Sequence, residues 1–98
     1  MKFYHATTPE IMDEIIEEGR IRRSWDGVVY LCKTAEDAAK FVAIRGAKTI
    51  QTIEVDLNES EVEESHDHAE SFFRCKAYIY GKDIEVTGDE DIEEYEVK

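Results

Sequence analysis

The chain has 98 residues, of which 42% are apolar, and a formal net charge of −12, which suits one domain with a single hydrophobic core. All of the net charge lies in residues 51–98, where sixteen Asp and Glu stand against four Lys and Arg, and repulsion from phosphates argues against direct nucleic-acid binding there. The sequence has no apolar run of about 18 residues, which argues against a membrane span. It shows no secretion signal and no paired cysteine spacing, which argues against export and against a disulfide framework. We therefore expect a cytoplasmic protein with reduced thiols.

Residues 2–5 are predicted to form a short strand, because aromatic side chains favour strands and turn-forming residues follow them. A helix is expected next, with Thr8 as its N-cap, Pro9 at its first position and Gly19 as its C-terminal stop. Apolar residues at the spacing of one helical face predict its buried side: Ile11, Met12, Ile15 and Ile16.

A basic loop, residues 20–26, carries the only tryptophan, and the apolar run 28–32 predicts a buried strand. Thr34 is expected to cap a second helix, with Asp37 three residues later as a short form of the capping box, and Gly46 ends that helix. Six residues are expected to fill its apolar side: Ala35, Ala38, Ala39, Phe41, Val42 and Ile44.

Residues 49–57 alternate and are rich in β-branched side chains, which predicts a strand. The acidic segment 58–70 is interpreted as a loop or a short irregular helix. Residues 72–73 and 77–80 predict one or two further strands, and residues 84–86 a last short one.

Two strand–helix pairs followed by several strands predict an α+β domain. The domain is expected to span residues 1–86. Residues 87–98 are almost all acidic and are interpreted as a tail that is flexible or weakly docked through Ile92, Tyr95 and Val97.

Several fragments together resemble one family. They are Tyr4-His5-Ala6-Thr7, a helix ending at Glu18-Gly19, a basic loop, Gly27-Val28-Val29-Tyr30-Leu31, and a second helix at Ala35-Glu36-Asp37-Ala38. This order is similar to the first half of an ADP-ribosyltransferase domain, closest to the tRNA 2′-phosphotransferase branch and its small prokaryotic and phage relatives. The likeness covers residues 3–57 well and 72–86 loosely, through similarity to two later strands. It implies a split β-sheet with two N-terminal helices.

The resemblance also implies an NAD site in a cleft between two half-sheets. His5 matches a histidine that contacts the ribose and holds the nicotinamide, and Thr7, two residues later in the same motif, is also expected to bind the cofactor. Tyr30 matches an aromatic residue that stacks on the nicotinamide ring. A neutral imidazole offers one donor and one acceptor, and a tyrosine ring offers a flat apolar face, so both suit this ligand.

Three arginines are expected near the phosphates of the cofactor. The resemblance implies that Arg74 falls near a phosphate-handling arginine of the phosphotransferase branch, and Arg22 and Arg23 are expected to meet the pyrophosphate from the basic loop as bidentate donors. For the catalytic glutamate of many transferases, the sequence offers Glu85, provided that the strand register differs from the family's. Two further departures are Ala6, where the family has glycine, and the lack of the phosphotransferase branch's N-terminal domain.

Each candidate has a simpler structural interpretation. His5 is equally well explained as a strand histidine bonded to a backbone carbonyl, whereas Tyr30, inside an apolar run, is better explained as a core residue. The segment 65–68, Ser-His-Asp-His, is better explained as a surface loop than as a metal site, since it lacks a third well-spaced ligand. Trp25 either stacks on a base, anchors a partner or covers the edge of the core.

Three functions are therefore expected from the sequence. The first is an NAD-binding ADP-ribosyltransferase-like protein that modifies a protein or nucleic acid. The second is a non-catalytic acidic inhibitor, a nucleic-acid mimic like phage anti-defence or anti-CRISPR proteins, which binds the basic surface of a nucleic-acid-binding protein. The third is an antitoxin-like regulatory partner of another small protein.

Overall fold

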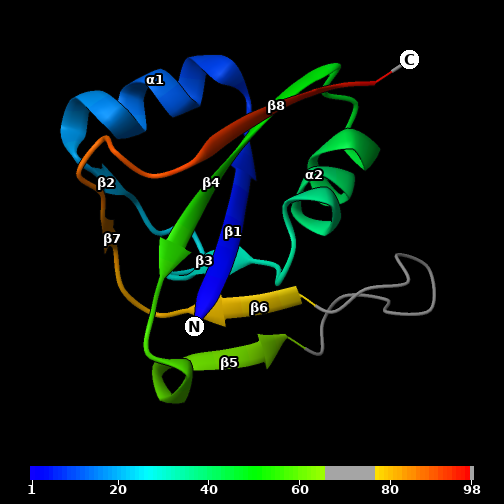
Figure 1. The fold of residues 1–98 in the computed structure, drawn as a ribbon. Helices are drawn as coiled ribbons and strands as arrows, with labels where there is room; N and C mark the ends of the chain where they lie inside the picture. The colour runs from blue at the N-terminus through cyan, green and yellow to red at the C-terminus, as the bar shows by residue number, and fades with distance from the viewer. Residues whose placement is uncertain (66–76, 98) are drawn as a thin grey trace.

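The computed structural model describes residues 1–65 and 77–97, and these form an α+β protein (Figure 1). In chain order its elements are β1 (Lys2–Thr7), α1 (Pro9–Glu18), β2 (Arg20–Ile21), β3 (Val29–Leu31), α2 (Ala35–Ile44), β4 (Thr49–Asp56), the 3-10 helix η1 (Glu59–Glu61), β5 (Val62–Ser65), β6 (Ala77–Tyr80), β7 (Ile84–Glu85) and β8 (Ile92–Glu96). The strand expected at 72–73 lies outside the described residues. Neither helix is long and apolar enough within this part of the chain to cross a membrane.

The strands form three antiparallel sheets, in the orders β1-β4-β8, β2-β7 and β3-β6-β5. One isolated bridge joins the first sheet to the third. Its two backbone bonds run from the N–H of Tyr4 to the carbonyl of Cys32, at 2.8 Å, and from the N–H of Cys32 to the carbonyl of Tyr4, at 2.9 Å. Strand β1 therefore touches β3 near its start and is otherwise the outer strand of its own sheet.

Strand β4 is the centre of the molecule, because both of its faces are buried. Ile53, at 0% exposure, lies on the face of the main hydrophobic core, which also contains Met12 and Ile15 of α1. Ile50 and Thr52, each 1% exposed, point to the opposite face because side chains alternate along a strand. Helix α2 packs on β1 and β4, so the two helices lie on either side of this sheet (Figure 1).

Helix α1 begins and ends where the sequence predicts, but its buried side is narrower. Met12 and Ile15 are buried as expected, whereas Ile11 is 47% and Ile16 38% exposed. The prediction of four buried residues was therefore wrong for these two, since only one narrow stripe of the helix meets the core. Gly19 ends the helix in the left-handed region, at φ 76°, and its N–H donates to the carbonyl of Ile15 at 2.9 Å.

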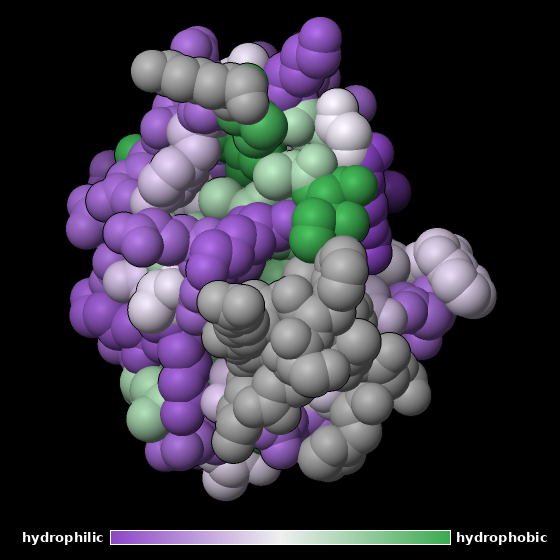
Figure 2. All heavy atoms as spheres, turned by 90° about the vertical axis from the view of Figure 1, so that its right-hand side faces the viewer, coloured by the Kyte–Doolittle hydropathy of each residue, from purple (hydrophilic) through white to green (hydrophobic). Residues whose placement is uncertain are grey.

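Helix α2 has the predicted cap, since the Thr34 hydroxyl accepts the N–H of Asp37 at 3.1 Å. Ala38 and Ala39 are buried, and such small side chains let the helix lie close to the sheet. Ile44 is 54% exposed, so its predicted burial was wrong. Figure 2 views the side of the molecule that carries α2 and shows an apolar area within a mostly hydrophilic surface.

Three strands were not predicted. Strand β2 lies in the expected basic loop and pairs with β7, and β5 follows η1 in the expected loop or irregular helix and pairs with β6. The third is β8, in the acidic segment interpreted as a tail, which pairs with β4 along five residues. Backbone ladders do not require apolar side chains, so the acidic composition concealed this strand.

Candidate functional site

A cavity of about 890 Å³ lies beside β1 and extends between α1 and α2. Strand β1 separates from β3 beyond the bridge between Tyr4 and Cys32, and residues from His5 to Thr7 line the cavity. The backbone groups of Tyr4 bond to β3, so those of Ala6, two residues on, point to the same side. No described residue bonds to these backbone groups of Ala6, so part of the cavity wall is a strand edge that is free within the described residues.

His5 carries the clearest chemistry in this cavity. Its Nδ1 lies 2.9 Å from the carbonyl oxygen of Tyr30, and because a carbonyl only accepts, Nδ1 must carry the proton and donate. Burial lowers the pKa of His5, and the bond to Tyr30 raises it by less. The imidazole is therefore neutral at pH 7, with Nε2 as a hydrogen-bond acceptor.

The second ring nitrogen of His5, Nε2, is the acceptor that a ligand could use. Nε2 makes no hydrogen bond to a described residue. In the same part of the chain, every fully enclosed side-chain nitrogen or oxygen has a partner. Nε2 is therefore not fully enclosed, and His5 lines the cavity.

Thr7 and Tyr30 line the same cavity as His5. Thr7 is 8% exposed and follows His5 on the same face of β1. Tyr30 is half-buried on β3, opposite Ile79 of β6, and its hydroxyl donates to the carboxylate of Asp26. The structure thus brings the predicted histidine, threonine and tyrosine together.

Among the described residues, three arginines line the cavity, and one of these three, Arg22, was predicted. Arg22 was expected, and its Nε donates to Glu18 at 2.7 Å. Arg20 lies 3.9 Å from the same carboxylate. Arg45, the C-cap of α2, forms no ion pair with a described residue. The sequence signal for Arg45 is weak, a lone cation before Gly46 at the end of the helix.

Two of the predicted site residues, Arg23 and Glu85, lie outside the cavity. Arg23 donates to the carboxylate of Asp83 from its backbone N–H, at 2.9 Å, and from its side-chain Nε, at 3.1 Å. It is not among the residues that line the cavity. Glu85 is exposed on β7, opposite Arg20, and lines a second groove. Arg74 lies outside the described residues. The cavity therefore contains neither the expected catalytic carboxylate nor the Arg23 guanidinium.

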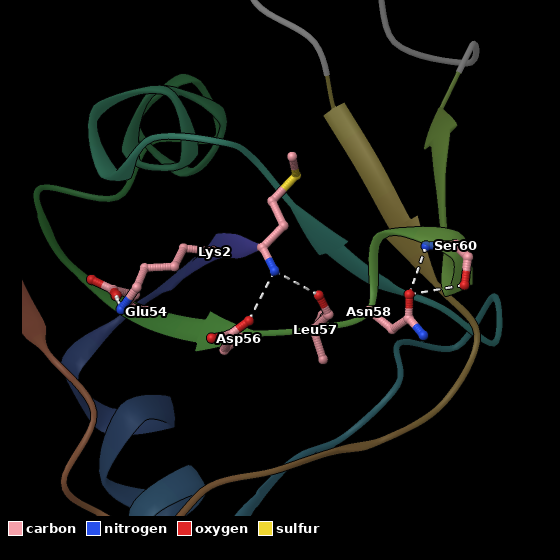
Figure 3. A network of polar contacts seen from close by, with 7 residues as sticks. Lys2, Glu54, Asp56, Leu57, Asn58 and Ser60 are labelled. Carbon is pink, nitrogen blue, oxygen red and sulfur yellow. Dashed lines mark hydrogen bonds and ion pairs between the residues drawn. The ribbon is translucent and has the colours of Figure 1, made fainter.

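The second groove, of about 650 Å³, is strongly acidic. Its carboxylates come from Glu54, Asp56, Asp83, Glu85, Asp89, Glu90 and Asp91. Lys2 also lines it and pairs with Glu54, and this hydrogen bond raises the pKa of Lys2 (Figure 3). At the same corner the side chain of Asn58 accepts from the backbone N–H of Ser60 at 3.1 Å, which fixes the chain as it leaves β4.

The positions of Trp25, a candidate named from the sequence, and of Cys32 are clear in the structure. Trp25 is 98% exposed, so its interpretation as a cover for the core was wrong. Cys32 is buried at the end of β3, where its backbone forms the bridge to β1. Of the segment 65–68 only Ser65 is described, so the metal interpretation of that segment falls outside the described residues.

Comparison of the chain with family models, with curated proteins and with solved structures found no match. The function is therefore inferred from the chemistry of the cavity beside β1 and of the second groove. The cavity beside β1 combines a neutral histidine, a tyrosine, a free strand edge and three arginines. The second groove is lined mainly by carboxylates.

Proposed function

We propose that this chain is a small protein with an ADP-ribosyltransferase-like fold that binds NAD or a close relative in the cavity beside β1. The observation that carries the proposal is that His5 and Tyr30 line one cavity, although they lie 25 residues apart in the sequence. In the family that the sequence resembles, a histidine and an aromatic residue at these two places hold the nicotinamide riboside. If the side chains of His5 and Tyr30 had pointed to opposite sides of a sheet, they could not have contacted the same ligand.

The size and composition of the cavity suit a dinucleotide. Its volume, about 890 Å³, is within the range of about 300–1,000 Å³ typical of small-molecule sites. Ile11 of α1 and Phe41 and Val42 of α2 supply apolar walls. Such walls, with a few polar groups at fixed positions, are the usual design of a site that takes flat rings.

The nicotinamide end is assigned to β1. A carboxamide has one acceptor and two donor hydrogens, which complements the N–H and C=O of Ala6 on the free strand edge. The Nε2 of His5 accepts a hydrogen bond, so it suits a ribose hydroxyl. The ring of Tyr30 supplies apolar contact to the pyridine ring.

The diphosphate end is assigned to the arginines. Guanidinium groups bind phosphate oxygens through two parallel hydrogen bonds. Arg45 has no competing ion pair among the described residues, whereas Arg22 shares its charge with Glu18. Glu14 and Glu18 also line the cavity, and their charge opposes that of the phosphates, so we expect modest affinity that falls as salt increases.

The proposal concerns binding. Transfer of ADP-ribose requires stabilisation of the cation that forms as nicotinamide leaves, and the family supplies it with a glutamate beside the ribose. Glu85 lines the acidic groove and not the cavity. Modification of a target would therefore need a different carboxylate.

An NAD titration followed by NMR tests the proposal. The side-chain signals of His5 and Tyr30 should shift together and saturate, while those of Tyr78, which does not line the cavity, should stay in place. Arg45→Gln should weaken binding several-fold. Arg23→Gln is the matched control, because it removes an equal charge that is already paired with Asp83 outside the cavity, and it should leave affinity unchanged. Unshifted His5 and Tyr30 signals at millimolar NAD would rule the proposal out.

A further inference from the structure

Strand β8 leaves one edge of the central sheet open. It is the outer strand in the order β1-β4-β8, and all of its side chains except that of Tyr95 are exposed. In Figure 1 it runs along the outside of β4 toward the C-terminus. An outer strand of this kind presents backbone donors and acceptors to whatever approaches.

Two backbone bonds at the ends of β8 establish which of its groups are free. The N–H of Glu54 donates to the carbonyl of Asp91 at 3.0 Å, and the N–H of Val97 donates to the carbonyl of Lys48 at 2.8 Å. Bonded positions alternate in an antiparallel pair, so positions 91, 93, 95 and 97 face β4. The intervening residues point their N–H and C=O away from the sheet, and no described residue bonds to them: Ile92, Glu94 and Glu96.

The open edge is also highly charged. Six of the eight residues from Asp89 to Glu96 are acidic and none is basic. None of these carboxylates forms an ion pair with a described residue. The described donors to Glu93 and Glu94 are neutral: the Tyr95 hydroxyl at 2.6 Å and the Gln51 amide at 3.0 Å. Within the part of the chain that the structure describes, no cation therefore compensates the negative charge along the strand.

This charge selects the partner. A second copy that paired with β8 in antiparallel register around Glu94 would place that glutamate opposite its own counterpart, and like charges directly opposite one another destabilise a sheet. A strand with Lys or Arg would instead gain the backbone bonds and the attraction of opposite charges. We propose that the free edge of β8 binds an extended, Lys- and Arg-rich segment of a partner protein as an additional strand. This inference goes beyond NAD binding and does not depend on it.

Amide hydrogen exchange on the full chain tests the added strand directly. The probe is an eight-residue peptide that alternates Lys and Val. In the free chain the amides of Glu93 and Tyr95 should exchange slowly, and those of Ile92, Glu94 and Glu96 should exchange fast. Saturation with the peptide should slow the three fast amides about tenfold or more, because each then acquires a hydrogen-bond partner.

Substitutions at one position separate the backbone from the charge. Glu94→Pro removes an outward N–H without removing a bond to β4, a change that edge strands tolerate, and it should abolish peptide binding. Glu94→Gln keeps the N–H and removes the charge, so it should weaken binding only several-fold and reduce its salt dependence. Glu63→Gln removes an exposed carboxylate from β5 and serves as the control with unchanged binding. Should Glu94→Pro lower the melting temperature sharply, Glu96→Pro replaces it at the last residue of the strand.

Other results would overturn the inference. They are an absence of peptide binding, binding that leaves the three outward amides fast, binding that survives Glu94→Pro in a folded chain, and equal binding of a peptide that alternates Glu and Val. Dimerisation of the chain alone, lost on Glu94→Pro, would assign the edge to a second copy instead.

Discussion

Replacing His5 by Phe tests the contact that ties β1 to β3 inside the cavity. The substitution keeps an aromatic ring but deletes the Nδ1–H that donates to the Tyr30 carbonyl at 2.9 Å. A net hydrogen bond contributes about 0.5–1.5 kcal/mol, and an unsatisfied buried carbonyl costs about 1–3 kcal/mol. Since Tyr30 is half-buried and water reaches part of its surroundings, we expect a loss of about 1–2 kcal/mol in the free energy of unfolding at pH 7.

The same substitution should change how stability depends on pH. Burial lowers the pKa of His5 below 6.5, so the native state keeps the imidazole neutral while the unfolded chain takes up a proton below that pH. The stability of the original protein therefore falls as pH decreases from about 7 to about 5, and His5→Phe lacks this contribution. The difference in stability between the two proteins should be largest above pH 7 and should shrink on acidification.

Urea unfolding at several pH values measures this difference, provided that the two proteins share one m-value. The other two histidines are common to both proteins and cancel in the comparison. A difference that grew as pH fell would show that the folded state holds a protonated His5. That result would refute the buried neutral imidazole and remove the acceptor at Nε2 on which the proposed ribose contact depends.

Three further predictions concern the scaffold. Ile53→Ala should lower the free energy of unfolding by about 2–5 kcal/mol in chemical denaturation, because this side chain is fully buried at the centre of β4, and an unchanged midpoint would contradict its place in the core. Thr34→Ala should cost about 1 kcal/mol by the same measurement through loss of the α2 cap, whereas Thr34→Ser should cost little. The hydrogen bond to Glu93, together with burial, raises the pKa of Tyr95 to about 12. In ultraviolet titration Glu93→Gln should move one phenol back toward pH 10, and an unchanged curve would place Tyr95 away from Glu93.

The parts of the fold that depend on local signals were predictable from the sequence. The Thr34 cap and the Gly19 stop involve partners within four residues, and both are present as expected. The strand at 49–57 was recognisable because its alternation and β-branched content are local as well. The α+β class followed from the order of these elements.

The missed strands depend on distant partners. Ile21 is 1% exposed in a two-residue strand, and only its pairing with Ile84, far along the chain, gives it that place. Strand β8 is recognisable only from its hydrogen-bond ladder with β4, because glutamate has a low strand propensity and the three glutamates of this segment argue against a strand. The exposure of Ile11 and Ile16 has a similar cause, because periodicity indicates a helical face but not how much of it the sheet can cover.

In the candidate site, too, residues with local sequence signals were predictable and residues placed by distant contacts were not. His5 and Tyr30 could be named from the sequence because they belong to recognisable motifs on strands. Arg45 could not, because its place beside the cavity follows from the packing of α2 on β1. Arg23 was expected in the site on its charge, and the bond to Asp83, sixty residues away, is what holds it elsewhere.

The two proposals use opposite edges of one sheet, which makes them physically separable. The cavity lies at the outer edge of β1 and the acidic edge belongs to β8, with β4 paired between them. Ile53 and Thr52, on the two faces of β4, are 0% and 1% exposed, so this strand is packed on both sides and has little room to shift. A strand added at β8 should therefore leave the NAD affinity at β1 unchanged, and coupling between the two would require β4 to move against both of its packed faces.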